Sequence, residues 1–161
     1  MFSIIIVLSF MLEGIFSNLV SIDSIFLPLF VLVTTIMIYP YFNNKKYTYI
    51  IICLLMGFFY DIIFTNSIFV NTIIFYLCSI VTILIFKVIN TRLIGSLFVN
   101  IIIIFIYRVL TYSLLYIIDY IPLNNITLIK SIYSSLIVNI IYGAIIYYIL
   151  KIIYKFCYKK V

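Results

Sequence analysis

Residues 57–67 read "GFFYDIIFTNS", an apolar run that carries a single carboxylate, Asp61. A charge at the depth of a bilayer costs from about 3 to more than 10 kcal/mol, so it usually marks a functional or strongly paired position. The rest of the chain is almost as apolar as this stretch. The role of Asp61 therefore depends on which other polar groups reach the same depth.

The composition predicts an integral membrane protein of the all-α class. The chain has 161 residues, of which 68% are hydrophobic and 9% are charged, and its mean hydropathy is +1.40. These values are typical of a bundle of membrane helices and exceed what a water-soluble core of this size requires. Since no hydrophilic stretch is long enough to fold separately, we expect one domain over residues 1–161. The charge of +6 indicates a basic membrane face, and we expect no nucleic-acid partner.

Short polar breaks divide the sequence into six apolar runs. The predicted spans are 2–20, 25–42, 47–64, 68–86, 93–118 and 128–154, and each approaches the ~20 residues that cross the hydrocarbon core. The first run lacks the basic start and small-residue cleavage site of a signal peptide, so we expect it to be retained as a span. The sequence predicts a bundle of about six transmembrane helices.

The positions of the basic residues predict the orientation of these spans. Lysines and arginines accumulate in short cytoplasmic loops. With six spans, eight of the ten fall on one side, whereas the opposite loops hold the acids Asp23 and Asp119 and only Lys130, at the start of the sixth span. The basic set is Lys45, Lys46, Lys87, Arg92, Lys151, Lys155, Lys159 and Lys160. We therefore expect both termini to be cytoplasmic, with a basic tail that also attracts anionic lipid.

Polar and small residues recur at four-residue spacing in three of the spans, and this spacing places them on one helix face. The rows are Tyr49, Cys53, Gly57, Asp61 and Thr65 in the third span, Ser131, Ser135, Asn139, Gly143 and Tyr147 in the sixth, and Ser9, Glu13 and Ser17 in the first. Such rows let membrane helices approach closely and form hydrogen bonds with each other. Helix packing is the favoured interpretation, with a ligand path as the alternative.

Charged residues inside the spans suggest a pairing. At ~1.5 Å per residue, Asp61 lies about 21 Å into its span from the cytoplasmic end and Arg108 about 22 Å into the fifth span. Glu13 lies about 16 Å into the first span by the same count. We therefore hypothesise that Arg108 pairs with Asp61, with Glu13 as a further partner, and that these residues serve assembly or partner docking.

Catalysis is disfavoured by what the sequence lacks. An intramembrane aspartyl peptidase needs two converging carboxylates, but Asp119 falls in an outer loop. A serine enzyme of the rhomboid type needs a base such as histidine, and the chain has none. The three cysteines show no CxxC spacing. We expect no enzymatic activity, no metal site and no cofactor.

The stretch "GFFYDIIFTNSIFVNTIIF" at residues 57–75 resembles the central signature of the MreD family of rod-shape-determining membrane proteins. In that family a glycine precedes an aspartate by four residues, and a polar residue follows about ten positions later. Gly57, Asp61 and Asn71 match these places, and Pro28 resembles the family's proline at the head of the second span. Phe69 departs from the family, because a glycine is common at that position.

The resemblance implies a non-catalytic scaffold of the bacterial cell-elongation machinery in the cytoplasmic membrane. Its implied partners are an MreC-like single-span protein and, through it, the MreB filament system and the peptidoglycan synthases, besides the membrane lipids. The family is also similar in fold to the substrate-binding subunits of energy-coupling-factor transporters. This similarity supplies the alternative function, which predicts an aqueous cavity near Arg108, Asp61 and Asn139. A proton- or ion-conducting subunit is a third interpretation, but it needs a polar file across the whole membrane.

Overall fold

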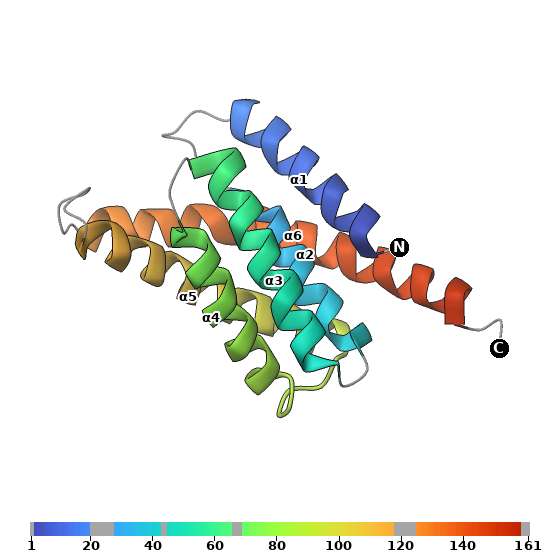
Figure 1. Ribbon diagram of the computed structural model, residues 1–161. Coiled ribbons are helices and arrows are strands. Elements are labelled where there is room, and N and C mark those ends of the chain that lie inside the picture. Colours follow the sequence, from blue (N-terminus) through green and yellow to red (C-terminus); the bar gives the residue numbers. More distant parts are fainter. Residues whose placement is uncertain (1, 20–27, 43–44, 66–68, 118–124, 159–161) are drawn as a thin grey trace.

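The computed structural model describes residues 2–19, 28–42, 45–65, 69–117 and 125–158, and the regular elements in this part of the chain are all helical (Figure 1). The α-helices are α1 (Phe2–Leu19), α2 (Phe30–Ile38), α3 (Lys46–Tyr60), α4 (Val70–Ile85), α5 (Leu93–Ile117) and α6 (Asn125–Tyr158). A 3₁₀ segment, η1 (Tyr39–Phe42), extends α2, and a π-helical segment, η2 (Asp61–Thr65), extends α3. The predicted all-α class is confirmed for the described residues.

Each of the six predicted spans overlaps one of these helices, but the lengths of the helices differ. Among the described residues, three helical segments are long and apolar enough to cross a membrane: Lys46–Thr65, Leu93–Ile117 and Leu128–Phe156. The apolar segments Phe2–Asn18, Phe30–Phe42 and Val70–Ile85 are shorter. The predicted second span is wrong at its start, because Leu29 has a φ of −139° and a ψ of 46° and the helix begins only at Phe30.

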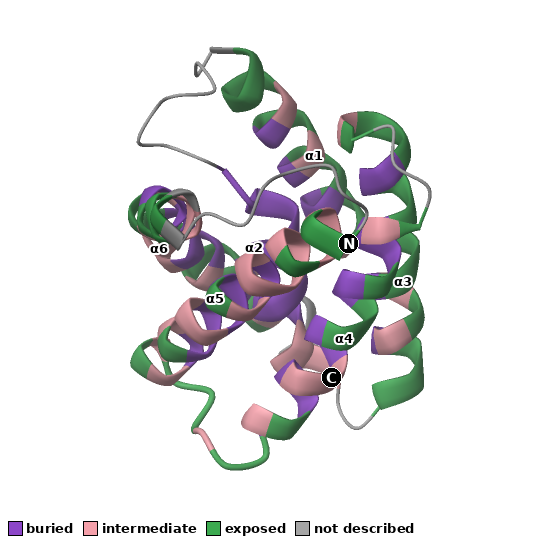
Figure 2. Ribbon diagram, turned by 90° about the vertical axis from the view of Figure 1, so that its left-hand side faces the viewer, coloured by how far each residue is buried: buried purple, intermediate pink, exposed green. Residues whose placement is uncertain are grey.

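The centre of the bundle is α2. All nine of its residues are buried, from Phe30 to Ile38, and it packs against α1, α4, α5 and α6. In Figure 2 the buried residues lie toward the middle of the bundle, and the surrounding helices are exposed on their outer sides. An apolar helix that is covered on every side needs no polar face. Its polar ends therefore have to be satisfied inside the protein.

One end of the bundle gathers segments that are far apart in the sequence. The ring centroid of Phe2 in α1 lies 6.1 Å from that of Tyr41, which in turn lies 5.1 Å from that of Tyr154 in α6. The Tyr39 and Phe86 rings lie 5.5 Å apart and add the end of α4. We call this the basic end, because its described cations are Lys45, Lys46, Lys87, Arg92, Lys151 and Lys155. Asp23, Asp119, Lys159 and Lys160 lie outside the described residues.

The predicted polar rows face the interior over most of their length. In α3 and η2 the residues from Tyr49 to Asp61 in the row are buried, whereas Thr65 is exposed. In α1, Ser9 and Glu13 are buried and Ser17 is exposed. In α6 the buried members are Ser135, Asn139 and Gly143. The prediction of interior seams is therefore confirmed for their central residues.

Candidate functional site

Asp61 lies at the junction of α3 and η2 and accepts hydrogen bonds from the first turn of α4. Its Oδ1 accepts from the backbone N and the side-chain Nδ2 of Asn71, at 2.9 and 3.0 Å. Its Oδ2 accepts from the backbone N and the Oγ1 of Thr72, at 2.9 and 2.8 Å. All four groups donate, which suits an ionised carboxylate that can only accept.

This contact is a helix cap supplied by another helix. The N-cap residue of α4 is Phe69, which makes no capping hydrogen bond with its own side chain. Asn71 and Thr72 therefore stand at the second and third helical positions, whose N–H groups have no partner within the helix. A carboxylate here satisfies both N–H groups and interacts favourably with the helix dipole, which contributes up to about 2 kcal/mol where the site is partly buried.

Gly57 allows α4 to come this close to α3. A Cβ atom at position 57 would lie 2.7 Å from the Cα of Thr72 and 2.8 Å from the backbone oxygen of Asn71. Distances below 3.0 Å from backbone atoms leave no room for a side chain. The predicted role of Gly57, close approach of a helix that meets Asp61, is thus seen within the chain, and the approaching helix is α4.

Asn71 connects this cap to a third helix. The hydroxyl of Tyr107 in α5 donates to Asn71 Oδ1 at 2.7 Å, and Asn71 Nδ2 also donates to Thr65 Oγ1 at 3.2 Å. Asn71 is 3% exposed, so an unpaired amide there would be costly. The structure brings together Gly57 and Asp61, which were expected on one helix face, and joins Asn71 and Tyr107 to them.

Phe69 precedes α4 in a strained conformation. Its φ of 64° and ψ of 6° lie in the left-handed region, and it is the only non-glycine residue with positive φ among those described. Such a conformation costs an L-residue about 1–2 kcal/mol, while glycine adopts it freely. Phe69 is also the position at which the chain departs from the MreD signature it resembles, since glycine is common at that position of the signature.

Glu13 caps α2 as Asp61 caps α4. Its Oε2 accepts from the backbone N of Val31 at 2.9 Å, and its Oε1 accepts from the hydroxyl of Tyr60 at 2.7 Å. Asn139 of α6 contributes at the same helix start, since its Oδ1 accepts from the backbone N of Leu29 at 2.8 Å. Glu13 is 1% exposed. The predicted assembly role of Glu13 thus corresponds to a contact that joins α1, α2 and α3.

Sequence reasoning missed several hydroxyl groups of the interior. Thr72 follows Asn71 and Tyr60 precedes Asp61, so adjacency to a predicted site residue was the signal that could have found them. A separate cluster links α1, α2 and α6: Ser9 Oγ lies 2.7 Å from Thr34 Oγ1 and 2.9 Å from Tyr142 Oη. Ser9 was placed in an interior row, but nothing in the spacing indicates that Thr34 and Tyr142 would meet it.

The hypothesis that Arg108 pairs with Asp61 is wrong. No ion pair links these two described residues, because the oxygens of Asp61 are directed at the start of α4. Arg108 is half-buried, its Nε is buried without a hydrogen-bond partner, and its Cζ lies 5.8 Å from the ring centroid of Tyr107. It is close enough to Glu13 for a Coulombic interaction but forms no ion pair with it. Equal depth in two helices did not mean that the side chains face each other.

The surroundings of the two described carboxylates, Glu13 and Asp61, indicate that these groups have a structural role. Each carboxylate is closed off by helix N–H groups and hydroxyls. Among the described residues, no group of three His, Cys, Asp or Glu side chains could hold a metal ion. Two hollows that the described residues line lie near Lys46, about 22 Å along α3 from Asp61 by the helical rise.

Comparisons with known proteins do not identify a relative of this chain. No protein-family model matches the chain, and no curated protein and no solved structure matches it either.

Proposed function

We propose that the chain is a non-catalytic membrane scaffold of the bacterial cell-elongation machinery, similar to MreD. In this proposal all six helices lie in the cytoplasmic membrane, with both termini and the basic end in the cytoplasm. Three helices have the length and apolarity for a full crossing. Six of the described cations lie at the basic end, whereas Lys130 lies near the start of α6 and Arg108 within α5. The six at one end support this orientation, because cytoplasmic loops retain lysine and arginine.

The single observation that carries the proposal is the use of both described carboxylates, which are buried, as helix caps. A transporter or an enzyme would direct such groups at a ligand or at a reacting atom. Here Asp61 holds the start of α4 and Glu13 holds the start of α2. The acids therefore fix a rigid bundle, and a rigid bundle is what a scaffold presents to its partners.

Arg108 is our proposed contact to a partner span. A guanidinium inside a membrane needs an anion or a set of acceptors, and none of the described carboxylates forms an ion pair with it. We propose that a single-span partner of the MreC type supplies an acidic side chain to Arg108. The MreB system and the wall synthases would then be recruited through that partner.

The proposal is tested by depleting the protein in its native cells. Loss of a cell-elongation scaffold should convert rods into round cells, and a plasmid copy of the wild-type chain should restore the rods. The capping variant D61N should insert into the membrane yet restore shape poorly. Depletion that leaves rod shape intact would refute the proposal. Reporter fusions that place the C-terminus outside the cell would refute the orientation.

A further inference from the structure

Two neighbouring hollows open at the basic end, away from the capped starts of α2 and α4. The first has a volume of about 390 Å³, and its lining residues are Tyr39, Pro40, Phe42, Lys45, Lys46, Phe86 and Thr91. The second has a volume of about 460 Å³, and its lining residues are Lys46, Tyr47, Ile50, Ile80, Ile83 and Leu84. Lys46 belongs to both linings, so the two hollows adjoin.

The two linings differ in chemistry. The first combines two ammonium groups and the threonine at position 91 with an aromatic wall, in which the Tyr39 ring centroid lies 5.5 Å from that of Phe86. The second runs along aliphatic side chains of α3 and α4, such as Ile50 and Ile83. A cationic hollow beside an aliphatic one fits an amphiphile that has an anionic head and an apolar chain.

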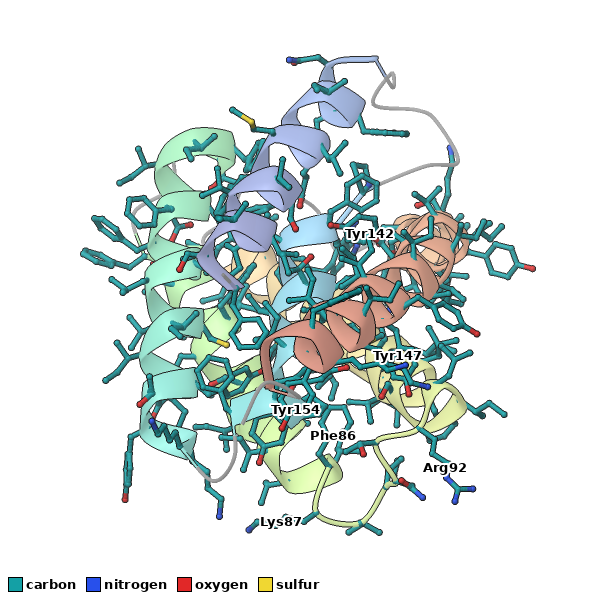
Figure 3. All side chains as sticks on the ribbon, turned by 90° about the vertical axis from the view of Figure 1, so that its right-hand side faces the viewer. Phe86, Lys87, Arg92, Tyr142, Tyr147 and Tyr154 are labelled. Atoms are coloured by element: carbon teal, nitrogen blue, oxygen red, sulfur yellow. The ribbon has the colours of Figure 1, made fainter. Side chains whose placement is uncertain are left out.

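No described carboxylate neutralises this end of the molecule. The described acids are Glu13 and Asp61, and both are engaged at helix starts away from the basic end. Figure 3 shows Lys87 and Arg92 projecting outward at this end, with Phe86 and Tyr154 further inside. Lysines and arginines that gather between membrane helices at the cytoplasmic face bind anionic headgroups. The charge of this end therefore complements a lipid phosphate.

We propose that the adjoining hollows form a binding site for one anionic phospholipid. The phosphate lies between Lys45, Lys46 and Thr91, and an acyl chain occupies the aliphatic hollow along α3 and α4. The inference rests on the proposed membrane location but not on the proposed role in cell shape. Carbonate washing of membranes tests that location separately, because an integral protein stays in the pellet.

The test is native mass spectrometry of the detergent-purified full chain with phosphatidylglycerol, and with phosphatidylcholine of the same acyl chains as the neutral comparison. Wild-type protein should retain one phosphatidylglycerol in preference to phosphatidylcholine. The double variant K45Q/K46Q should lose about 30-fold in affinity for phosphatidylglycerol, because each lysine near an anionic lipid contributes about a fivefold factor. I80W, which fills the aliphatic hollow, should lower retention of both lipids.

The matched control is K151Q/K155Q, which removes the same charge from the same end but from residues that line neither hollow. It should retain phosphatidylglycerol within about threefold of wild type. An equal loss in the two double variants would overturn the site, as would an absence of preference in wild type. Displacement of the lipid by millimolar glycerol phosphate would also overturn it, because the hollow would then bind a soluble phosphate.

Discussion

Two of the four donors to Asp61 are backbone N–H groups, which cannot adapt to a change at this position. In D61N one carboxylate oxygen becomes an NH₂ group, which faces the backbone N–H of Asn71 or Thr72. A backbone N–H cannot turn to accept a hydrogen bond, so a donor meets a donor and one buried N–H is left unpaired. We expect a loss of about 2–4 kcal/mol in the free energy of unfolding. Denaturant titration in detergent, followed by circular dichroism, measures it.

The matched comparison is E13Q. One oxygen of Glu13 meets the hydroxyl of Tyr60, which can rotate and accept from an amide NH₂. The other oxygen can continue to accept from Val31 N. We expect a loss of about 1 kcal/mol, smaller than that of D61N. Equal losses in the two variants would contradict the distinction between the two caps.

Phe69 offers a second test at the residue scale. F69A and F69G both remove the ring contact with Phe58, whose centroid is 6.1 Å away, but only glycine relieves the φ of 64°. We expect F69G to be more stable than F69A by about 1 kcal/mol, the reverse of the order inside a helix. Thermal unfolding in detergent compares them. A more stable F69A would mean that this residue does not adopt the left-handed conformation.

Among the helices, the packing of α3 on α4 depends on the absence of a side chain at Gly57. The Cβ of G57A would lie 2.7 Å from the Cα of Thr72, so the helices must separate and the hydrogen bonds to Asp61 must lengthen. We expect G57A to cost about 1–3 kcal/mol. The control is G14A, whose Cβ would meet Phe64 at 3.7 Å, an ordinary contact. Similar unfolding curves for the two variants would rule out close packing at Gly57.

The sequence predicted which faces of the helices are interior but not which groups meet there. Four-residue spacing correctly joined Gly57 to Asp61, because helical periodicity is local. The partner of Asp61 could not be predicted in this way, since depth along two helices does not define the direction of their side chains. The competing donors were the N–H groups at the start of α4, and every helix start carries such groups. Only the tertiary structure places the start of α4 beside Asp61.

For the whole molecule, a variant at Arg108 distinguishes a role in folding of the bundle from a role in binding a partner. Its buried Nε has no hydrogen-bond partner, so the apolar variant R108M should leave the melting temperature of the isolated chain unchanged or raise it. The same variant should lose its partner span on purification from native membranes. R92Q serves as the control, because Arg92 is exposed in the loop before α5. A large drop in melting temperature for R108M would mean that Arg108 serves the fold of the bundle.

We propose that this bundle is a scaffold for wall synthesis. The most direct test is purification of a tagged chain from native membranes, with identification of the bound proteins by mass spectrometry. We expect a single-span protein with an extracytoplasmic domain, together with peptidoglycan synthases. Recovery of a transmembrane coupling subunit with ATPases would contradict it and would indicate a subunit for solute uptake.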